Sequence, residues 1–165
     1  MIYIFLVETN ADNKSDERYI RSLLDFRYNY LGHKLKFIYM EGKSKYDTKE
    51  TEIKKWQRKY NSTSKVFMCI DLDNDIKNRN NSILNKSIIN YCDKNRYEFI
   101  WFNEDIEQVF WGKSVSDSQK KDESKKFYAS NNITNIKIDN LRKNTFASRK
   151  TSNIIAVLDR NLTLK

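Results

Sequence analysis

The stretch that decides the fold is Val66-Phe67-Met68-Cys69-Ile70, an unbroken apolar run that leads directly into Asp71-Leu72-Asp73. Such a run is typical of a central strand that is buried on both faces of a parallel sheet. An earlier run, Ile2 to Val7, also ends in an acid, Glu8. Functional groups of open α/β folds lie beyond the carboxyl ends of the strands. We therefore expect Glu8, Asp71 and Asp73 to meet at one edge of a sheet.

The apolar residues around these two runs alternate between a strand period and a helix period. Further strands are predicted at 35–40 and 97–102, and apolar stripes at 20–24, 53–60 and 84–91 predict helices between the strands. The order βαβαβαβ indicates an α/β fold with a central, mostly parallel sheet of about four to five strands. Its crossovers should be right-handed, with helices flanking the sheet.

The chain after residue 103 gives less regular signals. A short helix is predicted over 104–111, with Glu107 on the side away from its apolar residues. Residues 113–126 show no apolar periodicity, so they predict a loop. A strand at 133–138 and a final amphipathic helix over 154–162 complete the prediction.

Length and charge suggest a single domain, residues 1–165, made of a core (1–112) and a basic C-terminal extension (113–165) that packs on it. The extension has 12 basic and 5 acidic residues, whereas the core has 19 and 17. A basic patch beside acidic residues suits a nucleic-acid backbone, but a solvated basic tail has the same composition. The candidate phosphate contacts are Lys113, Arg142, Lys143, Arg149 and Lys150.

Composition also limits the cellular setting and the chemistry. The first residues lack the basic segment and length of a signal peptide, and no run approaches the roughly 20 apolar residues of a membrane span. We therefore expect a cytoplasmic protein without a membrane partner. The two cysteines and one histidine form no cluster in the sequence, so any metal would be held by oxygen, which favours Mg²⁺ or Mn²⁺.

The strand-end acids suggest metal-assisted phosphoryl chemistry. A divalent ion polarises a phosphate and stabilises the leaving oxygen, and a second ion about 4 Å away assists the attacking water. If the strand geometry continues past residue 70, Asp71 and Asp73 point to the same side of the sheet. Glu8 would then act as a ligand or a general base. The alternative is that these residues are exposed loop acids, because Asp is common in turns after strands.

This arrangement resembles the TOPRIM domain of topoisomerases, primases and OLD-type nucleases. The resemblance rests on Glu8 after the first strand, on Asp71 and Asp73 after the third, and on the elements between them. The segment 97–111 is similar to the one that follows the fourth strand in RloB-like proteins of phage defence, with Ile106-Glu107 in place of an aromatic-Glu pair. The resemblance implies Mg²⁺-dependent cleavage of DNA or RNA, with Glu8, Asp71 and Asp73 as the catalytic and metal site and Glu107 as an outer metal ligand. The family often has Gly after the first acid, whereas this chain has Thr9-Asn10.

Other classes of protein fit the sequence less well or remain open. A phosphoacceptor receiver domain needs its acid pair after the first strand, but here the pair follows the third. Nucleotide-binding glycine motifs are absent from the sequence. A non-catalytic TOPRIM-like adaptor that binds nucleic acid or a larger defence ATPase stays open, as does assembly into a homo-oligomer.

Overall fold

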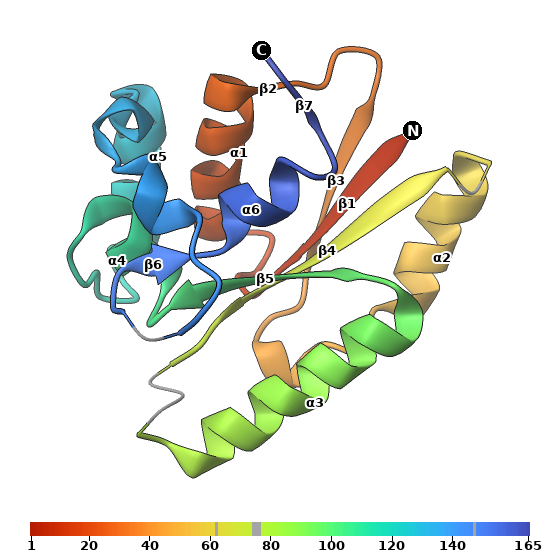
Figure 1. Ribbon diagram of the computed structural model, residues 1–165, viewed down its shortest axis with the longest axis horizontal. Coiled ribbons are helices and arrows are strands. Elements are labelled where there is room, and N and C mark those ends of the chain that lie inside the picture. The colour runs from red at the N-terminus through yellow and green to blue at the C-terminus, as the bar shows by residue number, and fades with distance from the viewer. Residues whose placement is uncertain (62, 74–76, 147) are drawn as a thin grey trace.

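The computed structural model describes residues 1–61, 63–73, 77–146 and 148–165. Within these ranges the chain forms an α/β fold with a five-stranded, mostly parallel sheet flanked by helices (Figure 1). The strands of this sheet are β1 (Ile2–Val7), β3 (Lys34–Tyr39), β4 (Ser64–Asp71), β5 (Glu98–Asn103) and β6 (Thr151–Ser152).

The sheet has the strand order β3-β1-β4-β5-β6. The pairs β1–β3, β1–β4 and β4–β5 are parallel, and β6 is an antiparallel edge strand. The chain leaves β1 toward β3 on one side and leaves β4 toward β5 on the other. The carboxyl ends of β1 and β4 therefore form the topological switch point, where open α/β sheets bind their ligands.

Helices cover both faces of the sheet, and their bounds follow in chain order. They are α1 (Ser15–Arg27), α2 (Glu50–Lys59), α3 (Arg79–Asn95), α4 (Ile106–Trp111), α5 (Lys120–Ala129) and α6 (Ile154–Leu158). Helices α2 and α3 lie on one face, and the other four lie on the opposite face (Figure 1). The 3₁₀ turns are η1 (Lys43–Lys45), η2 (Asn132–Asn135) and η3 (Ile138–Leu141).

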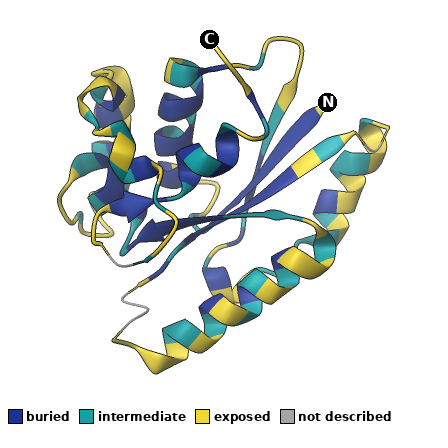
Figure 2. Ribbon diagram, in the orientation of Figure 1, coloured by how far each residue is buried: buried dark blue, intermediate teal, exposed yellow. Residues whose placement is uncertain are grey.

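Alternation along the strands sends side chains into two separate hydrophobic layers. Phe5 and Phe67 stack with a centroid distance of 4.6 Å in the layer under α1, whereas Ile4 and Met68 belong to the layer under α2 and α3. The central strands are therefore buried along nearly their whole length (Figure 2). The two cysteines are buried as well, Cys69 in the α1 layer and Cys92 in the other.

The four predicted parallel strands are confirmed, and their ends agree with the prediction within two residues. The first three predicted helices are confirmed as well. The region after residue 112 differs from it. The predicted loop 113–126 contains the start of α5, because Phe127 is buried among aromatic side chains and orders the helix. The predicted strand 133–138 is instead the turn η2 and the residues that lead to η3, with Ile133 buried.

The final helix is shorter than predicted. Helix α6 ends at Leu158, and Leu162 packs into the core from a turn. A small ribbon then forms, because β7 (Thr163–Leu164) pairs antiparallel with β2 (Tyr28–Asn29) at the end of α1. Within the described ranges, no helix combines the length and apolar character that a bilayer crossing needs.

Candidate functional site: carboxylates at the switch point

Glu8 and Asp71 meet at the carboxyl ends of the adjacent strands β1 and β4. The backbone N–H of Asp71 donates a hydrogen bond of 2.7 Å to Glu8 Oε1. Burial raises the pKa of Glu8 to about 8; the hydrogen bond from Asp71 opposes this shift, and the charge of Asp73 reinforces it. The first two acids predicted from the sequence are therefore brought together, and burial favours the protonated form of Glu8.

Asp71 is held between the sheet and the start of α4. Its Oδ1 accepts a hydrogen bond of 2.9 Å from the backbone N–H of Ile106. Burial raises the pKa of Asp71 well above its ordinary value, and the nearby charge of Glu8 raises it further. Asp71 is therefore a carboxylate whose orientation is fixed but whose charge is poorly compensated.

Asp73 reaches the same edge by a different geometry from the one expected. Strand β4 ends at Asp71, and Asp73 adopts a left-handed backbone with φ 50°, which Asp tolerates better than most residues. Its N–H donates to the carbonyl of Glu104 at 3.0 Å. The strand alternation therefore does not continue to Asp73, whose half-exposed carboxylate instead lies 2.7 Å from Lys43 Nζ.

Asp16 is a fourth carboxylate of this edge that sequence reasoning did not single out. It is 7% exposed, and its Oδ2 accepts the backbone N–H groups of Glu8 at 3.1 Å and Thr9 at 3.2 Å. In the sequence it looks like an acid that favours the first turn of a helix, which is also true. In the structure it fixes the backbone that carries Glu8.

Glu107 lies deeper than the sequence predicted. Helix α4 is buried on both sides, so Glu107 is 0% exposed rather than turned away from the core. Neither of its carboxylate oxygens accepts a hydrogen bond within the described part of the chain, and Lys120 Nζ lies 3.7 Å from one of them. Burial raises the pKa of Glu107 to about 7, against the opposing charge of Lys120. Lys120 begins α5, in the segment predicted as a loop.

Three of the five basic candidates lie near the carboxyl end of β5 or the end of α4. Arg149 pairs with Glu104 at 2.8 Å, and Glu104 directly follows β5. The Lys150 amino group donates to the carbonyl of Gly112, and Lys113 pairs with Glu123 at 3.0 Å. Each of these three cations therefore has a partner within the chain, and the partners lie directly after β5, at the end of α4 and on α5.

The other two basic candidates lie elsewhere. Arg142 pairs with Asp159 at 2.7 Å, and Asp159 also binds Arg27 at the far end of α1. Lys143 lines a hollow on the outer side of β5, together with Trp101 and Asn153. The structure does not bring these two side chains to the carboxylates.

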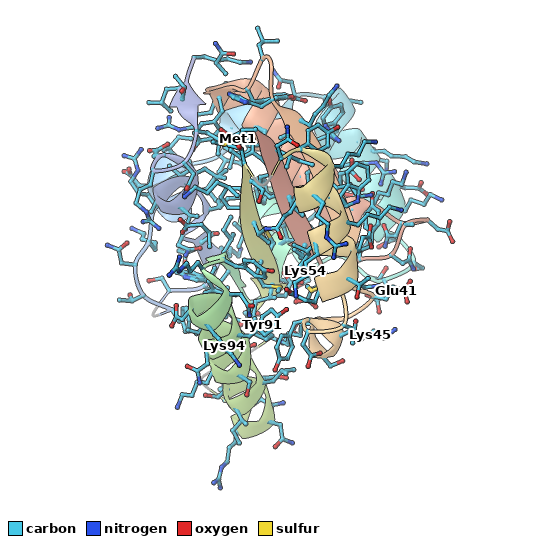
Figure 3. All side chains as sticks on the ribbon, turned by 90° about the vertical axis from the view of Figure 1, so that its right-hand side faces the viewer. Met1, Glu41, Lys45, Lys54, Tyr91 and Lys94 are labelled. Atoms are coloured by element: carbon cyan, nitrogen blue, oxygen red, sulfur yellow. The ribbon has the colours of Figure 1, made fainter. Side chains whose placement is uncertain are left out.

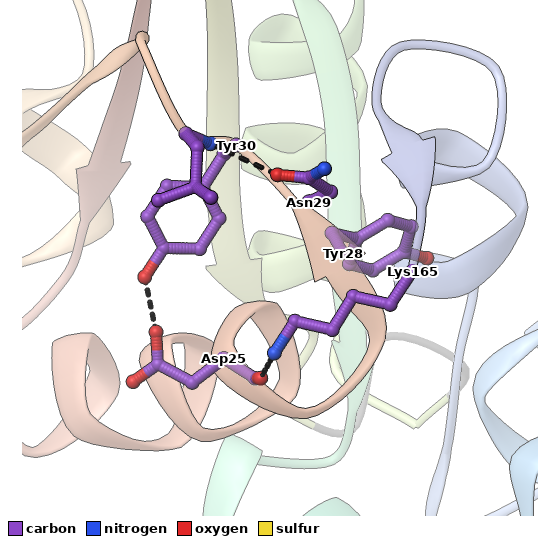
Figure 4. Close-up of a pocket in the computed structure, with 6 residues that line it drawn as sticks. Asp25, Tyr28, Asn29, Tyr30 and Lys165 are labelled. Atoms are coloured by element: carbon purple, nitrogen blue, oxygen red, sulfur yellow. Dashed lines mark hydrogen bonds between the residues drawn. The ribbon is translucent and has the colours of Figure 1, made fainter.

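A hollow of about 460 Å³ at the far end of α1 is a separate feature of the surface. Asp25, Tyr30 and Lys165 line it with Tyr28, Asn29 and Leu31 (Figure 4). The hydroxyl groups of Tyr30 and Tyr128 both donate to the Asp25 carboxylate. The acid of this hollow therefore accepts hydrogen bonds from two tyrosine hydroxyl groups.

The carboxylates that gather at the switch point, called the acidic edge below, are Glu8, Asp16, Asp71, Asp73 and Glu107. They have the ligand chemistry of a magnesium or manganese site. Its donors are carboxylate oxygens from three chain segments, and the unbonded oxygens of buried Glu107 have no other described partner besides Lys120. In the present side-chain arrangement, no three acids, histidines or cysteines of the described ranges are grouped closely enough to hold an ion. The residues therefore fit such an ion by their chemistry, and binding it would require the carboxylates to converge.

Comparisons with protein-family models, with curated proteins and with solved structures found no match for this chain.

Proposed function

We propose that this chain is a TOPRIM-like, metal-dependent nuclease that cleaves phosphodiester bonds of DNA or RNA. The observation that carries the proposal is the contact of Glu8 with Asp71 at the switch point, with Asp73 beside them. The raised pKa values of Glu8 and Asp71 support it, because strongly perturbed acids gathered in one place are typical of functional sites.

Glu8, Asp71 and Asp73 would hold Mg²⁺ or Mn²⁺, with Glu107 as an outer acid. The ion would supply Lewis-acid polarisation of the phosphate and stabilise the leaving oxygen. The chain's own residues would orient the carboxylates and accept a proton. Asp16 holds the backbone of Glu8, the N–H of Ile106 orients Asp71, and Glu8 is suited to accept a proton from water once its own proton has been displaced.

The basic residues near the acidic edge suit a nucleic-acid substrate. Arg149 pairs with Glu104 directly after β5, while Lys150 and Lys113 lie at the end of α4, the helix whose first N–H binds Asp71, so cations that bind phosphates would flank acids that bind metal. The defence setting implied by the resemblance and the cytoplasmic location remain predictions.

The test is cleavage of supercoiled plasmid DNA and of a mixed RNA pool with Mg²⁺ or Mn²⁺. We expect cleavage by the wild type and a loss of at least about 100-fold in Asp71→Asn, which keeps the Oδ1 acceptor for Ile106 but removes the charge. Asp122→Asn is the matched control, because Asp122 is an exposed acid of α5 that pairs with Lys125 at 3.6 Å. Full activity of Asp71→Asn would overturn the assigned site.

The second candidate is a non-catalytic adaptor of the same fold. Two lysines favour it: Lys43 lies against Asp73 and Lys120 against Glu107, so part of the acidic charge is compensated from within the chain. Metal-independent binding of nucleic acid or of a partner ATPase, without cleavage of either substrate, would select this candidate.

A further inference from the structure

Lys43 is a buried lysine in the middle of the acidic edge. Its side chain is 7% exposed, and its Nζ donates to the carbonyl oxygen of Asp71 at 2.7 Å and lies 2.7 Å from Asp73 Oδ2. A lysine is almost never buried to this extent unless its charge is paired. The ammonium group is therefore part of the site and not of the surface.

The turn that carries Lys43 is tied to the end of β1. Gly42 opens η1 with φ 109°, a conformation that glycine adopts without strain, and its N–H donates to the carbonyl of Glu8 at 2.9 Å. The same chain segment thus holds the backbone of Glu8 and carries the lysine that contacts the Asp71 carbonyl and the Asp73 carboxylate. This placement does not depend on a flexible surface side chain.

Lys45, two residues along the same turn, provides the contrast. Its side chain is 50% exposed and pairs with Glu41 at 3.2 Å, an i,i+4 pair on the outside of the turn (Figure 3). Such exposed pairs contribute little to stability. One lysine of η1 is therefore an ordinary surface residue, and the other is directed into the carboxylates.

The surroundings of the Lys43 ammonium group are those of a bound cation. A carboxylate oxygen and a backbone carbonyl oxygen are the ligand types that divalent ions take from proteins. The charge of Lys43 also opposes the upward shift of the Glu8 pKa, so it acts on the carboxylates of both strands. A divalent ion in the position of the ammonium group would need the oxygens that Lys43 already holds.

We propose that Lys43 is a resident cation of the site and takes the place of one of two divalent ions, so that the chain binds a single ion. This inference rests on the proposed metal-dependent function. Glu8, Asp71 and the other oxygen of Asp73 remain for the one ion, while the ammonium group holds Asp73 Oδ2. Lys120 is a weaker match for such a role, because it lies 3.7 Å from Glu107 and its side chain is 24% exposed.

The experiment is a calorimetric titration of Mn²⁺ into the intact chain. We expect one ion per chain for the wild type. Lys43→Met removes the charge but keeps the apolar stem, and it should bind either two ions or one ion on the order of tenfold more tightly, because a nearby positive charge has been removed. Lys43→Arg should behave like the wild type, and so should the matched control Lys45→Met. Circular dichroism and cooperative thermal unfolding establish that each variant is folded.

The outcomes separate this inference from the proposed function. Two ions in the wild type, or a folded Lys43→Met with unchanged stoichiometry and affinity, would overturn the role of Lys43 and leave the nuclease proposal standing. Absence of Mn²⁺ binding in both proteins would overturn both proposals. Binding by Lys43→Met alone would overturn both proposals as well, because the wild-type chain would then hold no divalent ion.

Discussion

Asp71 and Asp159 are two aspartates at opposite ends of the same fold, in opposite surroundings. Asp159 accepts hydrogen bonds from Arg27, Tyr28 and Arg142, the closest at 2.7 Å. Burial alone would raise its pKa, but the hydrogen bonds from Arg27 and Tyr28 lower it below the ordinary value. Around Asp71, burial and the charge of Glu8 act in the same direction, and the pKa rises.

Asp159 therefore stabilises the fold, whereas Asp71 lowers its stability. The partners of Asp159 join α1 to the last helix, so its charge is compensated and contributes to stability. The carboxylates at the switch point are gathered with too little positive charge, which is unfavourable unless a cation or a proton joins them. Natural folds tolerate such groups at functional sites, where activity requires them.

The largest expected effect is an opposite change in stability for the two Asp→Asn variants. Asp159→Asn should lower the free energy of unfolding by about 1–2 kcal/mol, since it breaks partly exposed charge-assisted hydrogen bonds. Asp71→Asn should leave the ion-free protein as stable as the wild type or more so. Thermal unfolding at pH 8 in EDTA measures both.

Cleavage should be affected in the reverse order. Asp71→Asn should lose it, as proposed above, whereas Asp159→Asn should retain activity within about twofold. A strongly destabilised Asp71→Asn would break the comparison, because Asp71 would then be a structural residue of the same kind as Asp159.

The second expected effect is a loss of stability as the pH rises. The pKa of Glu8 is raised from 4.5 to about 8, and that of Glu107 from 4.5 to about 7. The unfolded chain loses these protons near pH 4.5 while the folded chain keeps them, so stability is greatest below pH 4.5 with respect to these groups. It is lost progressively up to about pH 8 for Glu8 and pH 7 for Glu107.

Denaturant unfolding of the ion-free protein across pH 5–9 tests this second effect, and Glu8→Gln should flatten the curve. Asp159 provides the internal reference, because its pKa is lowered. The stability that Asp159 contributes is fully present above pH 3.8, its ordinary pKa, and is lost only as the pH falls through its pKa in the folded state. Equal slopes for wild type and Glu8→Gln would contradict the assignment of the raised pKa to Glu8.

The smallest expected effect is on the salt dependence of nucleic-acid binding. It compares an arginine near the acidic edge with an arginine at the far end of α1. Arg149→Gln, beside Glu104 near the acidic edge, should reduce the slope of log affinity against log salt by about 1 for a short DNA or RNA. Arg142→Gln, beside Asp159, should leave the slope unchanged. Fluorescence anisotropy at several salt concentrations measures both, and the opposite ranking would place the nucleic acid at the far end of α1.

The parallel sheet could be predicted because its strands are dense apolar runs that end in polar residues. The runs at 2–7 and 66–70 are long enough to be unambiguous, and the structure places strands there. Helix α5 could not be predicted in the same way. It buries one large apolar residue, Phe127, so its order comes from packing on α1 and not from a periodic stripe. Strand β6 consists only of Thr151 and Ser152, which give no strand signal.

The candidate site was predictable in part for a similar reason. The rule that sites lie beyond strand ends was enough to select Glu8, Asp71 and Asp73, since a strand end is visible in sequence. Asp16 and Lys43 act through hydrogen bonds whose partners are distant or unremarkable in sequence. In a chain with 31 lysines and arginines, nothing in the sequence distinguishes Lys43 from Lys45.

The separation of the core into two layers gives the molecule two internal thiol probes. Cys69 lies in the layer under α1, and Cys92 lies in the layer under α2 and α3, where burial raises its pKa to about 12. Each thiol reacts with an alkylating reagent only when its own layer opens. Labelling rates at the two cysteines therefore report the opening of each side of the sheet separately, without any engineered residue.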